Sequence, residues 1–197
     1  MDASSRSLIT TRLRNCAAVL EDLLKDGSYL GTVAAVAETV TIALRSEHKV
    51  LFFGNGGSAA DAQHFAAELC GRYLRERCSL PGLALTTNSS ALTAIGNDYS
   101  FDTIFARQIE GIGLAGDVAF GISTSGNSVN VIRAMEVAKR RKLVTIGLAG
   151  RDGGKMRAAV DHCVCIPSQE TPRIQEAHIL TGHIICELVE RSLFGEE

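Results

Sequence analysis

Two residues that could do chemistry, His64 and Glu68, stand four positions apart behind a glycine-rich turn in the segment GNGGSAADAQHFAAEL, residues 54–69. Positions four apart share one face of a helix, so the sequence predicts an imidazole and a carboxylate side by side. Such a pair suits acid–base chemistry, although taken alone it is more often a solvated surface couple. The turn lacks the lysine of a P-loop and the third glycine of a dinucleotide fingerprint. We therefore expect an anion site with titratable groups behind it.

A second loop of small and hydroxyl residues, STSGNS at 123–128, lies between an apolar run and a predicted helix. It combines free backbone N–H groups at a helix start with four hydroxyl side chains: Ser123, Thr124, Ser125 and Ser128. Either loop alone is equally well explained as a turn with an N-cap. Two such loops favour an anionic ligand, and the absence of a nearby lysine or acid cluster favours a sugar phosphate over a nucleoside triphosphate.

The last predicted helix, TPRIQEAHILTGHIICELVERSLF, has Pro172 near its start, and polar residues interrupt its apolar pattern. Gln175 and His183 are eight residues apart and project to roughly the same side, while a lone histidine such as His178 is more often a core residue. Asn97 and Asp98 fall in GNDYSF, which we expect to be a loop and which alone could be only a turn.

The elements that must position these residues alternate between strands and helices. Short apolar runs occupy 49–54, 82–87, 117–123, 143–150 and 162–167, and helix-length segments such as 128–142 separate most of them. Continuous apolar strands with intervening helices predict a parallel sheet covered on both faces, hence an α/β fold. Ligands of such sheets bind beyond the carboxyl ends of the strands, where both small-residue loops lie.

Two amphipathic helices are expected before the first strand, separated by Gly27 and Ser28. The first places a stripe of six residues on one side: Leu13, Cys16, Ala17, Leu20, Leu23 and Leu24. We expect residues 1–48 to pack on the core or on a partner subunit and residues 49–197 to form the sugar-phosphate domain, the two making one structural unit.

The composition excludes several classes of protein. A net charge of −2, 5% aromatic residues and no Trp argue against nucleic-acid binding. No apolar stretch approaches the roughly 20 residues of a membrane span, and we expect no membrane association. The six cysteines are scattered without a CxxC motif, which favours reduced thiols in a cytoplasmic protein. Cys163 and Cys165 share a face of one strand, where packing is a commoner role than metal binding.

The motifs GNGGSAADAQHFAAEL, GND, GISTSGNSVNVIRA, DGGKM and RIQEAHILTGH, taken in order, resemble the phosphoheptose isomerases of the sugar isomerase (SIS) domain family. The resemblance covers nearly the whole chain. GNGGS and STSGNS resemble the wider SIS superfamily. The combination of His64, Glu68, Gln175 and His183 narrows the resemblance to the phosphoheptose isomerases. It implies a five-stranded, flavodoxin-like parallel sheet between helices, and a homotetramer whose active sites use residues of neighbouring subunits.

The same resemblance implies an aldose–ketose isomerase that converts sedoheptulose 7-phosphate to D-glycero-D-manno-heptose 7-phosphate for nucleotide-activated heptose in lipopolysaccharide, capsule or S-layer synthesis. Glu68 and His183 would be the acid–base pair, and one zinc per subunit would bind His64, Glu68, Gln175 and His183. Substrate would be bound by Asn55, Gly56, Gly57, Ser58, Glu68, Asn97, Asp98, Ser123, Thr124, Ser125, Ser128 and Gln175.

Two alternative functions would require the anion-binding loops but not the acid–base pair of an isomerase. A non-catalytic SIS tetramer that binds the bacterial replication initiator has similar length and loops, and a regulatory SIS domain would only sense a sugar phosphate. Neither requires the carboxylate of Glu68 or the imidazole of His183, and both residues are present here. The sequence therefore favours the enzyme.

Overall fold

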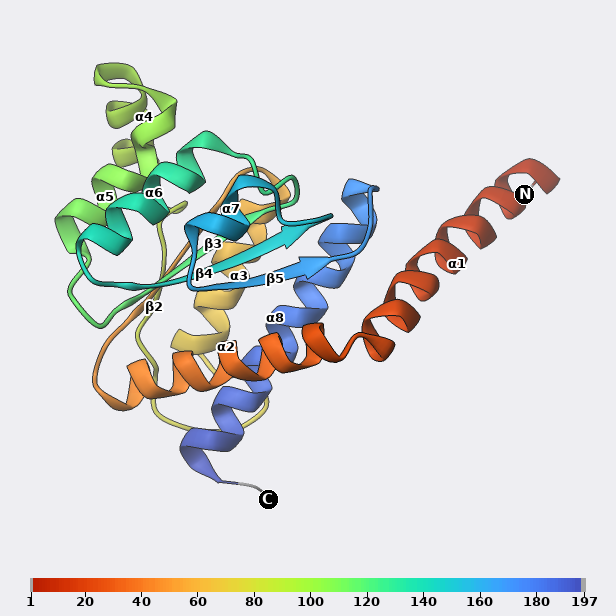
Figure 1. The fold of residues 1–197 in the computed structure, drawn as a ribbon, viewed down its shortest axis with the longest axis horizontal. Coiled ribbons are helices and arrows are strands. Elements are labelled where there is room, and N and C mark those ends of the chain that lie inside the picture. Colours follow the sequence, from red (N-terminus) through yellow and green to blue (C-terminus); the bar gives the residue numbers. More distant parts are fainter. Residues whose placement is uncertain (1, 196–197) are drawn as a thin grey trace.

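The computed structural model describes residues 2–195 as a five-stranded parallel sheet with helices on both faces (Figure 1). The strands lie in the order β2-β1-β3-β4-β5. Their bounds are β1 Val50–Gly54, β2 Gly82–Ala84, β3 Val118–Ser123, β4 Val144–Gly150 and β5 His162–Ile166. The predicted α/β class and all five strands are confirmed, although β2 is shorter than its apolar run because only three of its residues pair with β1.

Eight α-helices and one 3-10 turn complete the described chain. The α-helices are α1 Ala3–Lys25, α2 Gly27–Arg45, α3 Gly57–Cys70, α4 Ser89–Asp98, α5 Ile104–Ile112, α6 Val129–Arg140, α7 Gly154–Ala159 and α8 Thr171–Phe194, and the 3-10 turn is η1 Phe101–Thr103. The long last helix was predicted from its apolar period and from a proline near its start, and α8 has those bounds.

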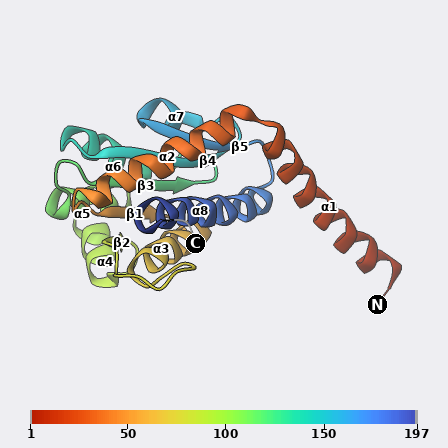
Figure 2. The ribbon, with the colours of Figure 1, turned by 90° about the horizontal axis from the view of Figure 1, so that it is seen from below.

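The central strands contribute to two hydrophobic cores because successive side chains point to opposite faces of the sheet. Val50 and Phe52 of β1 face a core built with α2, α3 and α8. Leu51 and Phe53 face a second core built with α5, α6 and α7. Figure 2 shows these layers, and both views show α1 extending away from the body. The layers hold α3 and α8 on the same face of the sheet.

Two local expectations were wrong. Gly27 and Ser28 do not separate the first two helices but begin α2, because the Asp26 carboxylate accepts hydrogen bonds from the N–H groups of Ser28 and Tyr29 and caps the helix. Asn97 and Asp98 are not in a loop but form the last two residues of α4.

Helix α2 also corrects the expectation about apolar stretches. It has 19 residues, and an 18-residue window of it has a mean hydropathy of 1.3, so the helix is long and apolar enough to cross a membrane by length and composition alone. In the fold the helix packs on the sheet and on α8, and Val33, Val36 and Val40 are buried in the first core. A helix that forms the interior of a globular protein meets the same criteria, and here packing accounts for its composition.

The two small-residue loops follow β1 and β3, which are neighbours in the sheet. The chain leaves β1 toward β2 on one side and reaches β3 on the other, so the strand order reverses between β1 and β3. That reversal is the switch point at which open α/β sheets bind ligands. Both predicted anion loops therefore flank the same crevice.

Candidate active site

The first loop is held open by backbone shape and by one amide pair. Gly56 has φ +56°, a conformation that favours glycine, and α3 begins directly after it. The side chains of Asn55 and Asn130 donate to each other at 2.9 Å, which ties this loop to the start of α6 behind the second loop. Ser58 is buried under the turn, so of the predicted binding residues here it is the least available to a ligand.

The second loop gathers its hydroxyl groups. Ser123 Oγ lies 2.9 Å from Ser128 Oγ and 3.5 Å from Ser125 Oγ. Gly126 turns the loop with φ +64°, and an added Cβ there would meet the carbonyl oxygen of Gly153 at 2.0 Å. Hydroxyls and free amides at the start of α6 are the donors that an oxyanion needs. The loop has the chemistry of a phosphate site without a cationic side chain.

The beginning of α8 closes the crevice beside both loops. A Cβ added at Gly150, the end of β4, would lie 2.6 Å from the carbonyl oxygen of Thr124 and 2.3 Å from Ile174 Cδ1. Gln175, the residue after Ile174, has its side chain against Gly57. A Cβ added at Gly57 would lie 2.2 Å from Gln175 Nε2. Gln175 therefore lies at the glycine turn, next to the sugar-phosphate loops.

The structure brings the three titratable residues of the prediction together. His64 Nε2 lies 3.1 Å from Glu68 Oε1 and 2.8 Å from His183 Nε2. One ligand atom from each of the three residues lies within 4.8 Å of the others, and all three side chains are partly exposed. In the described chain this is the one group of three or more His, Cys, Asp or Glu side chains that could hold a metal ion.

A close contact between α3 and α8 positions His64 next to His183. Phe65 and Gly182 lie against each other, and a Cβ at Gly182 would stand 2.0 Å from two atoms of the Phe65 ring. Because His64 precedes Phe65 and His183 follows Gly182, the contact of ring and glycine brings the two imidazoles into range. Sequence spacing predicts that each residue faces one side of its helix, but it does not give this register between helices.

Gln175 does not reach that group within this chain. Eight residues separate it from His183, which corresponds to about 12 Å along the helix axis. The chain itself therefore unites three of the four predicted zinc ligands, and it places Gln175 apart from them, against Gly57 at the start of α3.

Asn97 and Asp98 also lie apart from the three residues. They are exposed at the end of α4, where the Asn97 amide donates to the Asp98 carboxylate at 2.9 Å. Asp98 is not among the His, Cys, Asp and Glu side chains whose ligand atoms gather within 4.8 Å around His64. The predicted part of Asn97 and Asp98 in substrate binding thus finds no support within the single chain.

Sequence reasoning missed a set of residues that fixes the loop after α3. The Tyr73 ring stacks on His183 with centroids 5.6 Å apart. Glu190 accepts hydrogen bonds from the N–H groups of Tyr73 and Leu74 and from the guanidinium of Arg77, whose pair with Glu190 is 2% exposed on both sides. Burial alone would raise the pKa of Glu190, but these donors hold it below its ordinary value.

A signal for this network was present in the sequence. Glu190 lies seven residues after His183, two turns along the same side of α8, with the apolar residues Cys186, Val189 and Leu193 around it. A carboxylate at such a position requires a buried partner, and Arg77 is that partner.

Asp61, one turn before His64, was also missed. Burial raises its pKa to about 6, and the nearby charge of His64 opposes the shift. Its Oδ2 atom is buried without a hydrogen-bond partner in the part of the chain that the structure describes. The carboxyl group of Asp61 is therefore more easily protonated than an ordinary aspartate.

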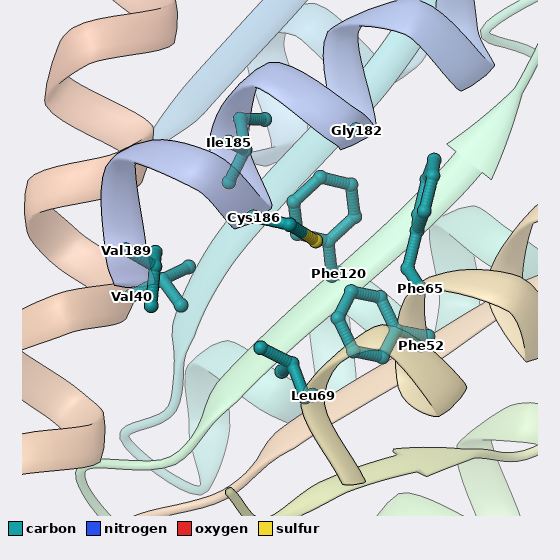
Figure 3. A pocket seen from close by; sticks show the side chains of 9 residues that line it. All are labelled: Val40, Phe52, Phe65, Leu69, Phe120, Gly182, Ile185, Cys186 and Val189. Atoms are coloured by element: carbon teal, nitrogen blue, oxygen red, sulfur yellow. The ribbon is translucent and has the colours of Figure 1, made fainter. Parts of the chain in front are cut away.

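Behind the site, an apolar cavity lies between the sheet and helices α2, α3 and α8 (Figure 3). Its lining includes Phe65, Phe120 and Cys186 and offers no polar side chain other than that thiol. A sugar phosphate cannot satisfy its hydroxyls there. His178 is likewise a core residue: it is fully buried, and burial lowers its pKa to about 4.

Comparison with known proteins places this arrangement in a family. Residues 13–150 match the family model described as the SIS domain. A phosphoheptose isomerase of Rhodospirillum rubrum is 53% identical over 90% of this chain and 95% of its own.

Two solved structures agree in fold along nearly the whole chain. A phosphoheptose isomerase of Neisseria gonorrhoeae superimposes with a TM-score of 0.87 at 44% identity, over 94% of this chain and 98% of that one. One of Francisella tularensis gives 0.91 at 32% identity, over 95% and 98%.

Proposed function

The chain belongs to the phosphoheptose isomerases of the SIS domain family, and we propose that it converts sedoheptulose 7-phosphate to D-glycero-D-manno-heptose 7-phosphate with Glu68 and His183 as the proton-transfer pair. The product would supply nucleotide-activated heptose for surface polysaccharide. The observation that carries this assignment is the meeting of Glu68 and His64 of α3 with His183 of α8 within 4.8 Å.

Isomerisation of a ketose to an aldose moves a proton from C1 to C2 through an enediolate while the carbonyl oxygen changes place. Glu68 takes the C1 proton and returns it to C2, because one carboxylate can serve two adjacent carbons. His183 exchanges protons with the oxygens at C1 and C2 and assists ring opening. Tyr73, stacked on His183, holds that imidazole in place.

The phosphate end of the sugar is assigned to the hydroxyl loop. Ser123, Thr124, Ser125 and Ser128 would bind the phosphate oxygens, and Asn55, Gly56 and Gly57 with Gln175 would line the sugar between the two ends. Glu68 lies eleven residues after Gly57, about 16 Å along α3, so the Glu68 that meets a sugar held in these loops would belong to a neighbouring subunit. Binding at the remote phosphate would fix the reacting carbons at that carboxylate, which converts binding energy into rate. Asn97 and Asp98 would contribute only to the site of a neighbouring subunit.

The donor set fits a zinc ion. Two imidazole nitrogens and a carboxylate are a common catalytic set that leaves a position open for substrate oxygens. His64 and His183, whose Nε2 atoms lie 2.8 Å apart, would hold the ion together with Glu68. Bound zinc would polarise the carbonyl and hydroxyl oxygens. Gln175 would complete the predicted set only from a partner subunit, since within the chain it lies at the glycine turn.

We further propose that the protein is a cytoplasmic homotetramer. Apolar side chains exposed on the single chain support an assembly: Leu13 and Leu24 of α1 are 67% and 73% exposed, and Leu180, Ile184 and Leu188 form an exposed stripe on α8 at helical spacing. Residues 1–48, assigned to core packing or the oligomer interface, include the projecting α1.

The test is an isomerase assay with sedoheptulose 7-phosphate, with and without a chelator, on the wild-type protein and on Glu68→Gln and His183→Gln. Both variants are expected to fold and to lose most turnover. Conversion by neither wild-type nor metal-loaded protein would leave the non-catalytic, initiator-binding alternative in its place.

A further inference from the structure

A pair of thiols lies outside the active site, on the last strand of the sheet. Cys163 and Cys165 alternate along β5, so both side chains point to the same face, and their sulfur atoms are 3.7 Å apart. Both residues are partly exposed. The other four cysteines have no such neighbour in the part of the chain that the structure describes.

The two thiols line a small polar pocket between β5 and the start of α2. Its lining includes Asp26, Ser28 and Arg157 with the two cysteines. The pocket is open to solvent, so a small polar oxidant can reach the sulfur atoms.

The surroundings favour a thiolate on one of the two residues. The hydrogen bond from the Cys163 thiol lowers the pKa of Cys165 to about 7, burial opposes this shift, and the positive charge of Arg157 adds to it. The same hydrogen bond and burial raise the pKa of Cys163. One sulfur is thus prepared to attack and the other remains a thiol.

We propose that Cys163 and Cys165 form a peroxide-sensitive dithiol whose oxidation to a disulfide displaces the sugar-phosphate loop. The Cys165 thiolate attacks hydrogen peroxide, the O–O bond breaks, a sulfenic acid forms, and the departing hydroxide takes up a proton to give water. Cys163 then attacks the sulfenic sulfur, the S–S bond forms, the S–O bond breaks, and a second water leaves with the thiol proton. Peroxide is reduced to two waters by the two electrons of the dithiol.

The position of β5 at the edge of the sheet allows the disulfide to form, but the backbone of the strand must change shape. Residues two apart on a strand are separated by about 6.6 Å, close to the upper limit for Cα atoms joined by a disulfide. The strand must therefore pucker for the bond to form. It can do so because β5 is an edge strand that pairs with β4 alone.

Metal binding is the weaker use of the pair. Among the residues that the structure describes, no third His, Cys, Asp or Glu completes a metal group with the two sulfurs. Arg157 beside them disfavours a bound cation.

Contact through Gly153 connects the dithiol to the loop at 123–128. A Cβ at Gly153 would lie 2.8 Å from Cys165 Sγ and 3.4 Å from Cys163 Sγ, so the backbone there rests on both sulfurs. The carbonyl oxygen of Gly153 in turn contacts Gly126, as the 2.0 Å approach to an added Cβ at Gly126 indicates.

Hydrogen bonds strengthen the same connection. The N–H of Met156 donates to the Gly126 carbonyl at 2.9 Å, and the N–H of Lys155 donates to the Asn127 side chain at 3.1 Å. The segment 153–156 is thus fixed between the sulfurs and the loop, and pulling the two sulfurs together shifts it.

The effect on substrate rests on the proposed function, whereas the oxidation does not. Purified protein is treated with hydrogen peroxide, alkylated and digested with trypsin. Mass spectrometry then measures the mass of the peptide of residues 158–173, which contains only these two cysteines. We expect loss of two hydrogens in wild type and a trapped sulfenic acid on Cys165 in Cys163→Ser. Cys78→Ser, which alters an exposed cysteine elsewhere, is the matched control and is expected to behave as wild type.

The functional arm measures KM for sedoheptulose 7-phosphate before oxidation, after oxidation and after dithiothreitol. Oxidation is expected to raise KM roughly tenfold, reversibly, and to have no such effect on Cys165→Ser. Peroxide that leaves both thiols alkylatable overturns the dithiol itself. A disulfide that forms with KM unchanged overturns the connection to the loop. If the protein has no isomerase activity, the peptide mass still shows whether the two thiols form a disulfide.

Discussion

Gly182→Ala tests the contact that brings the two imidazoles together. The added methyl carbon would stand 2.0 Å from the Phe65 ring, whereas ordinary contacts of a Cβ begin near 3.4 Å. The ring is 1% exposed and cannot turn away, so α3 and α8 must move apart by about 1 Å. His64 and His183, which flank this contact at 2.8 Å, separate with the helices.

The expected cost follows from these distances. Overpacking of this kind destabilises by about 1–3 kcal/mol, which the better helix propensity of alanine reduces by up to about 1 kcal/mol. A net loss of about 1–2 kcal/mol lowers Tm by roughly 2–8 °C in a chain of this length. Misplacing catalytic groups by about 1 Å lowers kcat/KM by about a hundredfold, so activity falls far more than stability.

The assay compares kcat/KM and Tm of Gly182→Ala with those of Gly111→Ala, a helical glycine with no atom within 4 Å of an added Cβ. Phe65→Leu combined with Gly182→Ala removes the obstructing ring atoms and is expected to recover part of the activity. Wild-type kcat/KM in Gly182→Ala, or a loss matched by Gly111→Ala, would refute the reasoning.

Three further predictions concern the loop, the acid limit of stability and the metal. Tyr73→Ala is expected to lower kcat more than tenfold with little change in KM, because the imidazole of His183 loses its stacked ring, and Tyr73→Phe should restore it. The pKa of Glu190 is held below its ordinary 4.5 in the fold, so this carboxylate stabilises fully above pH 4.5 and the stability is lost as pH falls below that value. Urea unfolding should show Glu190→Gln less stable than wild type by about 3 kcal/mol at pH 7, with the gap closing on acidification, whereas Glu187→Gln, at a partly exposed pair, changes little; a constant gap at all pH values contradicts this. Dialysis against a chelator is expected to abolish isomerisation and added zinc to restore it, with bound metal counted by elemental analysis; full activity in metal-free protein contradicts the zinc assignment.

The sequence was sufficient for the features that are local. Apolar runs predicted the five strands, and a continuous helical period with a proline near its start predicted α8. The glycine and hydroxyl loops could be placed at one edge of the sheet because parallel strands all end there.

What the sequence could not supply depends on how elements meet. The contact of Phe65 with Gly182 sets the register of α3 against α8, and no spacing within either helix contains it. The same register places Gln175 at the glycine turn, although its side of α8 was predicted correctly. Glu190 appeared only as an odd charge on an apolar face until the fold supplied Arg77.

The apolar stripe of α1 is a further example of a feature whose packing partner the sequence does not identify. Its spacing predicts a buried face, yet in the single chain Leu13 and Leu24 are largely exposed and only Val19 and Leu23 of α1 are buried. A partner copy would explain the stripe, and the molar mass in solution by light scattering tests whether four chains assemble.

The central claim is that one carboxylate carries a proton between two adjacent sugar carbons while an imidazole beside it serves the oxygens. Isomerisation of sedoheptulose 7-phosphate in D₂O, followed by NMR of the C1 and C2 positions, tests it most directly. Wild type is expected to incorporate solvent deuterium at these carbons, and folded Glu68→Gln, still stabilised against heat by the sugar phosphate, is expected to give neither exchange nor product. Exchange and turnover near the wild-type rate in Glu68→Gln would contradict the account.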